Sequence, residues 1–337
     1  MVRRFVGNFV RANVLGRQHI LPYFALYYTT HRCNARCEWC SRAKEVCAET
    51  IINESDLPRT REFLAQVRKL VPTLYVSGGE PLVMGDIEER LRIACELKFY
   101  PILLNTNATL LDRHWGVLEL IDTLVVSLHT LNTKKLARTY KISESMADRA
   151  LENIREAARR AKVMGTAKIM ANCVLTAENI DEVPAILNFC LDQGIELAVV
   201  PAIVNQQPTI LSASVEERIT YVRVLDLLIK QKRKDSKSIQ GSIGYLLHIR
   251  DLKPVACRPD GLLPVSPDGY VINACDADYI NLWRIEGTTS IISMLRRKMD
   301  FKEPFRSCSS NCLKACYTQP AVLLKEPWRA VLEYLSR

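Results

Sequence analysis

The chain has 337 residues, 48% of them hydrophobic, enough for one large domain with a sizeable core or for one domain plus an appendage. No apolar run is long enough to span a bilayer, and residues 1–21 lack the continuous apolar block of a signal peptide. The formal net charge is +9, yet no nucleic-acid-binding module is recognisable. We therefore expect a cytoplasmic protein without a nucleic-acid partner, whose charge reflects a solvated surface or an anionic ligand.

Hydrophobic residues recur at helical spacing near the amino terminus, and arginines accompany them. This pattern predicts an amphipathic helix over residues 1–22. Such a helix lies on an anionic membrane, plugs the base of a barrel, or packs on the next helix. Peripheral membrane contact through residues 1–20 is therefore one open alternative.

Strand and helix patterns alternate from residue 23 to residue 204. The strand candidates are residues 23–30, 73–81, 100–109, 123–130, 167–176 and 195–204. The helix candidates are residues 56–70, 85–99, 112–121, 145–165 and 180–194. Several strands are nearly continuous apolar runs, which is typical of parallel strands covered on both faces. The alternation predicts an α/β fold, either a βα barrel or an open doubly wound sheet.

Polar residues follow the strand candidates, as in "CNARCEWC", "SGGEP", "NTNAT" and "SLHT". In both α/β architectures the functional site lies at the carboxyl ends of the strands. The sequence therefore predicts one active-site face. The pattern changes after residue 204, with two helix candidates over residues 214–234 and 242–252, and then a segment rich in Pro, Gly, Asp and Cys.

Cys33, Cys37 and Cys40 form the densest cysteine cluster of the chain. Clustered cysteines in a reducing compartment indicate metal or redox chemistry rather than disulfides. Three thiolates from one loop can hold a cubane iron–sulfur cluster and leave one iron open to a small molecule. A structural zinc site is the alternative, although zinc usually takes four protein ligands.

The spacing C-x3-C-x2-C over Cys33–Cys40, directly after the first strand candidate, resembles that of the radical S-adenosylmethionine (radical SAM) superfamily. "SGGEP", at the end of the next strand candidate, resembles the GGE motif of that family. The resemblance implies a partial (βα)6-type TIM barrel. It also implies a 4Fe-4S cluster held by Cys33, Cys37 and Cys40, with S-adenosyl-L-methionine (SAM) chelating the open iron.

The activity that the resemblance implies is reductive cleavage of SAM to a 5′-deoxyadenosyl radical. This radical abstracts a substrate hydrogen or adds to an alkene, and the electron comes from a flavodoxin- or ferredoxin-type donor. The resemblance also assigns SAM contacts to Trp39, Gly78, Gly79, Glu80, Pro81, Asn105, Ser127, Arg138 and Asn172. For each polar residue of this set an ordinary turn or cap role remains open, and His129 is interpreted as structural.

The last quarter of the chain holds five further cysteines: Cys257, Cys275, Cys308, Cys312 and Cys316. This set resembles the SPASM/twitch extensions of radical SAM enzymes, and implies one auxiliary 4Fe-4S cluster that assists electron transfer. A zinc site of four thiolates is the alternative. We interpret Cys47 as a loop thiol, and Cys95, Cys173 and Cys190 as small buried hydrophobes.

The expected domains are residues 1–22 as a helix, 23–210 as the barrel, 211–252 as a helical connector, and 253–337 as an auxiliary iron–sulfur domain with a terminal helix. Three functions remain open. The first is modification of a small molecule or a lipid by radical SAM chemistry. The second is maturation of a peptide or protein by crosslinking, oxidation or epimerisation. The third is a zinc or iron–sulfur protein that catalyses nothing.

Overall fold

The structure is a computed structural model that describes residues 2–15, 20–40, 54–204, 207–253, 255, 258–272, 281–286 and 313–325. The predictions for Cys47, Cys257, Cys275, Cys308 and Cys312 lie outside these residues, as does the terminal helix expected beyond residue 325.

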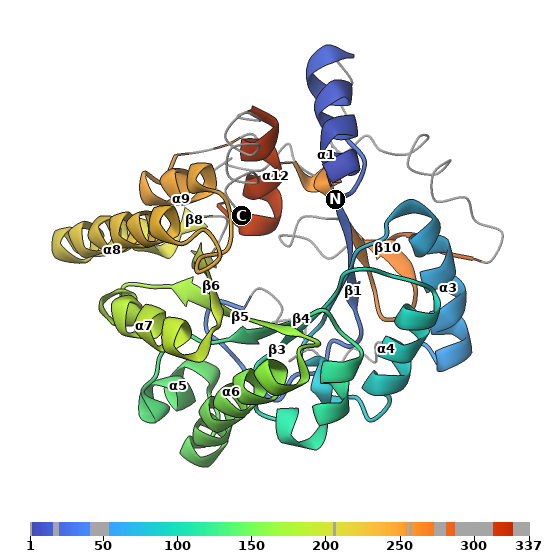
Figure 1. The fold of residues 1–337 in the computed structure, drawn as a ribbon, viewed down its shortest axis with the longest axis horizontal. Helices are drawn as coiled ribbons and strands as arrows, with labels where there is room; N and C mark the ends of the chain where they lie inside the picture. The colour runs from blue at the N-terminus through green and yellow to red at the C-terminus, as the bar shows by residue number, and fades with distance from the viewer. Residues whose placement is uncertain are drawn as a thin grey trace.

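Six parallel strands form the centre of the fold. They are β1 (Phe24–Tyr28), β2 (Leu74–Ser77), β3 (Ile102–Thr106), β4 (Thr123–Ser127), β5 (Lys168–Leu175) and β6 (Glu196–Pro201). They lie side by side in chain order, and each pair is parallel. Helices follow the strands on the outer side of a curved sheet (Figure 1). The α/β prediction with its six strands is confirmed, and the curvature selects the partial barrel.

The long helices are α3 (Leu57–Leu70), α4 (Ile87–Glu96), α6 (Glu144–Met164) and α7 (Val183–Gln193). Capping residues mark three of their ends. The Asp56 side chain accepts from the Arg59 amide and starts α3. Gly165 and Gly194 end α6 and α7 with φ angles of +66° and +69°, which a residue with a Cβ rarely adopts.

Two segments differ from the prediction. Residues 112–121 form two short 3₁₀ turns (Leu111–Arg113 and Trp115–Glu119) rather than one helix. The segment after β4 forms an additional helix, α5 (Thr133–Tyr140), whose first turn is capped by the Asn132 side chain bonding to the Lys135 amide. Only three of its eight residues are buried, so its apolar face was too narrow to recognise.

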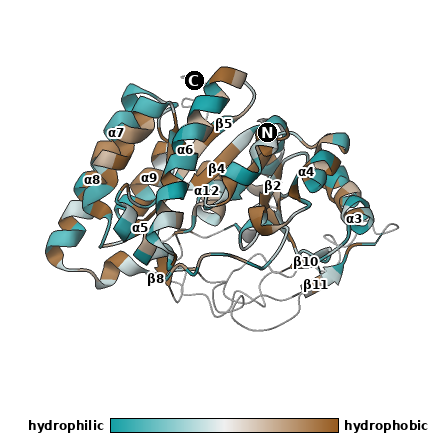
Figure 2. Cartoon of the chain, turned by 90° about the horizontal axis from the view of Figure 1, so that it is seen from below, coloured by the Kyte–Doolittle hydropathy of each residue, from teal (hydrophilic) through white to brown (hydrophobic). Residues whose placement is uncertain are grey.

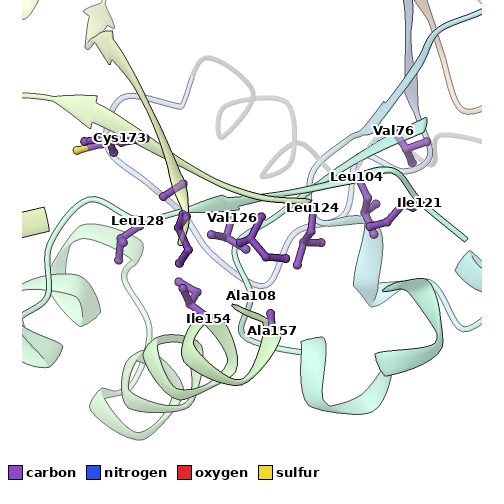
Figure 3. Close-up of a cluster of buried hydrophobic side chains, with 14 of the residues drawn as sticks. Val76, Leu104, Ala108, Ile121, Leu124, Val126, Leu128, Ile154, Ala157 and Cys173 are labelled. Atoms are coloured by element: carbon purple, nitrogen blue, oxygen red, sulfur yellow. The ribbon is translucent and has the colours of Figure 1, made fainter. Parts of the chain in front are cut away.

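The main hydrophobic core lies between the sheet and its outer helices. Leu124 and Val126 of β4 lie over Ile154 and Ala157 of α6, and Leu104 of β3 lies beside Ile121 (Figure 3). Hydrophobic and hydrophilic residues alternate along the helices (Figure 2), as expected for helices that cover a sheet with one face.

The three scattered cysteines had been expected to be buried. Cys173 and Cys190 are both 0% exposed in this core, which confirms that expectation. The prediction for Cys95 is wrong, because its thiol is exposed at the end of α4. The buried face of that helix instead includes Arg90, whose guanidinium bonds to the Tyr27 hydroxyl, the Thr60 hydroxyl, the Ser55 carbonyl and the Asp86 carboxylate.

Past β6 the chain forms a short strand pair, β7 (Ile203–Val204) with β8 (Gln207–Pro208), and then a 3₁₀ turn. Two helices follow, α8 (Val215–Lys234) and α9 (Ile243–Arg250), as predicted. Ser214 and Glu217 start α8 with reciprocal side-chain bonds to each other's backbone amides, a capping box.

A β-hairpin turns at Pro267–Gly269. It joins β9 (Leu262–Val265) to β10 (Tyr270–Ile272), which pairs in turn with β11 (Asn281–Arg284). Strand β9 pairs in parallel with β1, so the described part of the chain contains a nine-stranded sheet in the order β11-β10-β9-β1-β2-β3-β4-β5-β6. The hairpin is thus continuous with the barrel sheet.

Helix α12 (Ala315–Lys325) lies between α9 and α1 (Figure 1). Its first turn places Tyr317 in a small hydrophobic cluster with Leu26 and Tyr28 of β1 and Leu262 of β9. Burial raises the pKa of Tyr75, and the neighbouring Cys316 thiol raises it further. The beginning of α12 is therefore packed against the β1 and β2 side of the sheet.

The amino-terminal helix is shorter than predicted. Helix α1 (Val2–Phe9) continues as a single π-helical turn to Val14. The Asn8 carboxamide bonds to both the amide and the carbonyl of Leu21, which draws the chain back toward the barrel. In the described part of the chain, no helix combines the length and hydrophobicity that a bilayer crossing requires.

Candidate active site

The cysteine loop, which we define as residues 29–40, follows β1 directly. Cys33 and Cys37 are half-buried and Cys40 is exposed. Burial raises the pKa of the Cys33 thiol to about 11 and that of Cys37 to about 12. The neighbouring Cys40 raises the pKa of both further, and Cys33 raises that of Cys37. The three sulfur atoms therefore lie near one another at the carboxyl end of β1.

The three cysteines supply thiolates, the donors that iron–sulfur clusters require. The thiolates of a cubane bind different iron atoms, and three of them leave the fourth iron without a protein ligand. A structural zinc site usually takes four protein ligands. The donor set thus fits a 4Fe-4S cluster with three protein ligands.

The GGE loop, residues 78–80, lies directly against the cysteine loop. The Gly79 amide donates to the Thr30 carbonyl and the Glu80 amide to the Arg32 carbonyl, both at 2.8 Å. A Cβ on Gly79 would lie 2.1 Å from the Arg32 carbonyl oxygen, and one on Gly78 would lie 2.5 Å from that of Thr30. The atoms that a side chain would meet here belong to the cysteine loop, so the two glycines allow the two loops to approach closely.

Glu80 is 1% exposed and joins the GGE loop to the end of β3. Its Oε1 accepts from the Leu82 amide at 3.0 Å and from the Thr106 hydroxyl at 2.8 Å, while Oε2 accepts from the Asn107 amide at 2.7 Å. Burial raises the pKa of this carboxyl to about 7, although the three hydrogen bonds oppose the rise. Pro81 is also buried and opens the short 3₁₀ turn that follows.

Three polar candidates share the concave face of the sheet. Ser127 pairs in register with Asn172, and Asn105 pairs with Val125, two residues before Ser127. Because alternate residues of a strand point to opposite faces, Asn105, Ser127 and Asn172 lie on one face. The other face carries Leu104 and Val126, which the helices cover. The structure thus brings these three candidates together.

Trp39 reaches β4 across the site. Its ring lies 5.1 Å from the His129 ring in a T-shaped contact, and His129 lies 5.6 Å from the Tyr140 ring. The His129 Nδ1 accepts from the Val174 amide at 3.1 Å, and burial lowers the pKa of His129 to about 3. His129 is therefore a neutral packing residue, which agrees with its structural interpretation.

The last candidate, Arg138, is exposed on α5. Two residues later, Tyr140 makes contacts that the sequence did not reveal. Its carbonyl accepts from the Arg36 amide at 2.8 Å and its hydroxyl donates to the Ser127 carbonyl at 2.8 Å. Helix α5, unrecognised in the sequence, therefore anchors the cysteine loop to β4.

Comparison with known proteins agrees with this geometry. The sequence model of the radical SAM superfamily matches residues 27–190, which include the end of β1, the cysteine loop, the GGE loop and strands β2 to β5. Residues 27–190 form a radical SAM domain. The chain is therefore an enzyme, and the interpretation as a non-catalytic metal protein is set aside.

Two similar sequences carry the same name. The GTP 3′,8-cyclase of Mycobacterium marinum is 30% identical over 178 residues, covering 51% of this chain and 48% of that protein. The probable GTP 3′,8-cyclase of Sulfurisphaera tokodaii is 25% identical over 169 residues, covering 50% of this chain and 51% of that protein. The chain thus spans about half the length of the curated relatives it matches.

Solved structures share the fold over more of the chain. SuiB of Streptococcus suis, bound to precursor peptide SuiA, has a TM-score of 0.64 at 16% identity, covering 90% of this chain and 70% of that chain. The enzyme anSMEcpe, with bound AdoMet and the Cp18Cys peptide, has a TM-score of 0.59 at 14% identity, covering 94% of this chain and 100% of that chain. At these identities the likeness concerns the fold alone.

Proposed function

We propose that this radical SAM enzyme cleaves SAM reductively and modifies a small molecule or a lipid. The observation that carries the proposal is the attachment of the cysteine loop to the GGE loop by two backbone hydrogen bonds, Gly79 to Thr30 and Glu80 to Arg32. This attachment holds three cysteines beside the concave face that carries Asn105, Ser127 and Asn172. A cluster and a nucleotide-sized ligand would meet there.

When bound, the cluster supplies the electron that cleaves SAM to a 5′-deoxyadenosyl radical. Cys33, Cys37 and Cys40 hold the cluster, and the Gly78–Pro81 segment, Trp39 and Arg138 line the approach of SAM. Glu80 serves first as a brace, since its carboxylate oxygens already accept three hydrogen bonds from the protein. Asn105, Ser127 and Asn172 orient SAM and substrate from the concave face.

Two comparisons bear on the substrate class: one with relatives of similar sequence and one with solved structures of similar fold. The relatives at 25–30% identity are named for a reaction of GTP, a small molecule, but the likeness covers about half of each. The peptide-bound structures share only the fold with this chain. We therefore place a small-molecule or lipid substrate ahead of a peptide, and the peptide-modifying function remains the second candidate.

Peripheral contact with anionic lipid is part of the proposal. The first 37 residues contain six arginines and no aspartate or glutamate. Val6, Val10 and Val14, spaced four residues apart along the amino-terminal helix, are 52%, 37% and 68% exposed. Apolar side chains beside cations suit the interface of an anionic membrane. We propose a cytoplasmic protein that can touch such a surface through residues 1–20.

An auxiliary 4Fe-4S cluster completes the proposed cofactor set. Cys257, Cys275, Cys308, Cys312 and Cys316 would supply its ligands, and a zinc site of four of these thiolates is the alternative. Cys316 supports a site near the substrate, because its thiol is close enough to Tyr75 of β2 to raise the pKa of that residue. The chemistry expected there is electron transfer to or from the substrate.

The test is SAM cleavage by the anaerobically reconstituted full chain. Dithionite or reduced flavodoxin is expected to release 5′-deoxyadenosine and methionine, and Cys37→Ala is expected to release neither. Candidate small molecules, lipid vesicles and peptides are then compared for incorporation of substrate deuterium into 5′-deoxyadenosine. Fully reconstituted protein that leaves SAM intact with both reductants would refute the proposed activity.

A further inference from the structure

Asn34 follows Cys33 in the cysteine loop, and its side chain points toward the segment that follows β3. Its Oδ1 accepts from the Asn107 Nδ2 at 2.8 Å, and its Nδ2 donates to the Thr109 hydroxyl at 2.7 Å. The Thr109 hydroxyl in turn donates to the Asn107 Oδ1 at 2.6 Å. The three side chains therefore form a closed ring of three hydrogen bonds, in which each side chain donates once and accepts once.

This ring continues into the buried parts of the barrel. The Asn107 amide donates to the Glu80 carboxylate, which connects the ring to the GGE loop. Asn153 of α6 donates to the Ala108 carbonyl at 2.8 Å. Ala108 lies between Asn107 and Thr109, the two ring members that follow β3. Asn107 and Thr109 are 8% and 0% exposed, so water cannot easily replace a lost partner. The ring is thus a rigid attachment point.

The opposite side of the cysteine loop has its own attachment. The Arg36 amide bonds to the Tyr140 carbonyl of α5, and Trp39 packs on His129. Two anchors, Asn34 on the β3 side and Arg36 on the α5 side, therefore lie between Cys33 and Cys37 in the chain. Of these two anchors, only Asn34 uses a side chain, so only it can be removed by substitution without altering the backbone.

We propose that Asn34 is a positioning residue that holds the cysteine loop in its ligand-ready conformation before a cluster is present. This proposal rests on the proposed function, since a loop held in place presents Cys33 and Cys37 at the spacing that a cluster needs.

Each hydrogen bond of the ring has a fixed donor and acceptor. Asn34→Asp removes the Nδ2 donor, and the Thr109 hydroxyl can donate to the new oxygen only by giving up its bond to Asn107, so this nearly isosteric change breaks the ring.

The test uses the metal-free, reduced full chain and measures the rate at which iodoacetamide alkylates each cysteine. Cys95 is exposed outside the loop and serves as the internal reference. Cys173 and Cys190 are fully buried in the core and report whether the fold persists. In Asn34→Ala, alkylation of Cys33 and Cys37 relative to Cys95 is expected to rise about tenfold, from the loss of buried hydrogen bonds.

A matched series separates the ring from general destabilisation. Thr109→Val removes the hydroxyl at nearly constant volume and is expected to reproduce the increase, as is Asn34→Asp. Thr109→Ser keeps the hydroxyl and is expected to stay within about twofold of wild type, since the ring is intact. Thr73→Val, a buried position at the opposite end of β2 with 5% exposure, is expected to leave both loop cysteines unchanged.

The proposal is overturned if Cys33 and Cys37 react at the wild-type rate in Asn34→Ala and Thr109→Val while Cys173 stays protected. If Cys173 also becomes reactive in both, amide hydrogen exchange of residues 32–40 in Thr109→Ser and Asn34→Asp decides. Equal exchange in those two variants contradicts the ring. Because no cluster or SAM is used, this outcome is independent of whether the enzyme cleaves SAM.

Discussion

Replacing Gly79 by alanine should separate the two loops that form the site. The new Cβ would lie 2.1 Å from the Arg32 carbonyl oxygen and 2.7 Å from that of His31, well inside van der Waals contact. Both obstacles are backbone atoms, which cannot rotate away. The loops must move apart, and the hydrogen bonds from Gly79 and Glu80 to the cysteine loop, each 2.8 Å long, are lost or weakened.

The two bonds and the steric strain together predict a loss of about 2 to 4 kcal/mol in the free energy of unfolding. Urea denaturation of the metal-free chain measures it, and the loaded variant should release little 5′-deoxyadenosine. Gly85→Ala is the matched control, because a Cβ at that glycine has no described atom within 4 Å. If Gly79→Ala were as stable as Gly85→Ala, the close approach of the two loops would be refuted.

Four further predictions concern the rest of the site. Cys37→Ala should lose SAM cleavage and part of the iron, while iron bound by the tail cysteines persists in a colorimetric iron assay. Cys257→Ala should lose the tail iron instead, and an iron content equal to wild type in both variants would defeat the two-site assignment. Burial lowers the pKa of His129 to about 3, so between pH 6.5 and 4 the unfolded chain binds a proton that the folded chain does not. Wild type should therefore lose about 1 kcal/mol of stability per pH unit relative to His129→Asn as the pH falls through that window, and parallel stability curves would contradict a buried neutral histidine. Val10→Asp should weaken flotation of the chain with anionic vesicles but not with neutral ones, and equal flotation of both chains would remove the membrane contact.

The sequence predicted the parts of the fold that depend on neighbouring residues. Helix ends at Asp56, Gly165 and Gly194 follow from local capping chemistry, and the strands follow from short apolar runs. Helix α12 was not predicted, because Pro320 lies inside it and an internal proline argues against a helix. The pairing of β9 with β1 joins segments more than 200 residues apart, which no local pattern encodes.

The candidate site likewise has parts that could be predicted from neighbouring residues and parts that could not. The cysteine and GGE motifs are recognisable because their residues are close in sequence, and the alternation of strand residues places Asn105, Ser127 and Asn172 on one face. The contacts that fix these motifs were hidden, since Asn34 bonds to Thr109, which lies 75 positions away. The close approach of the motif glycines to the cysteine loop was hidden too, because their neighbours there lie more than 40 positions away in the sequence.

The central claim is that three cysteines hold a cluster whose remaining iron is open to SAM. The most direct measurement is the electron paramagnetic resonance spectrum of the dithionite-reduced chain, recorded with and without SAM. A tail variant lacking Cys257 and Cys275 isolates the signal of the cysteine loop. We expect SAM to change the g values of that signal. A reduced-cluster spectrum that SAM leaves unaltered would contradict the account.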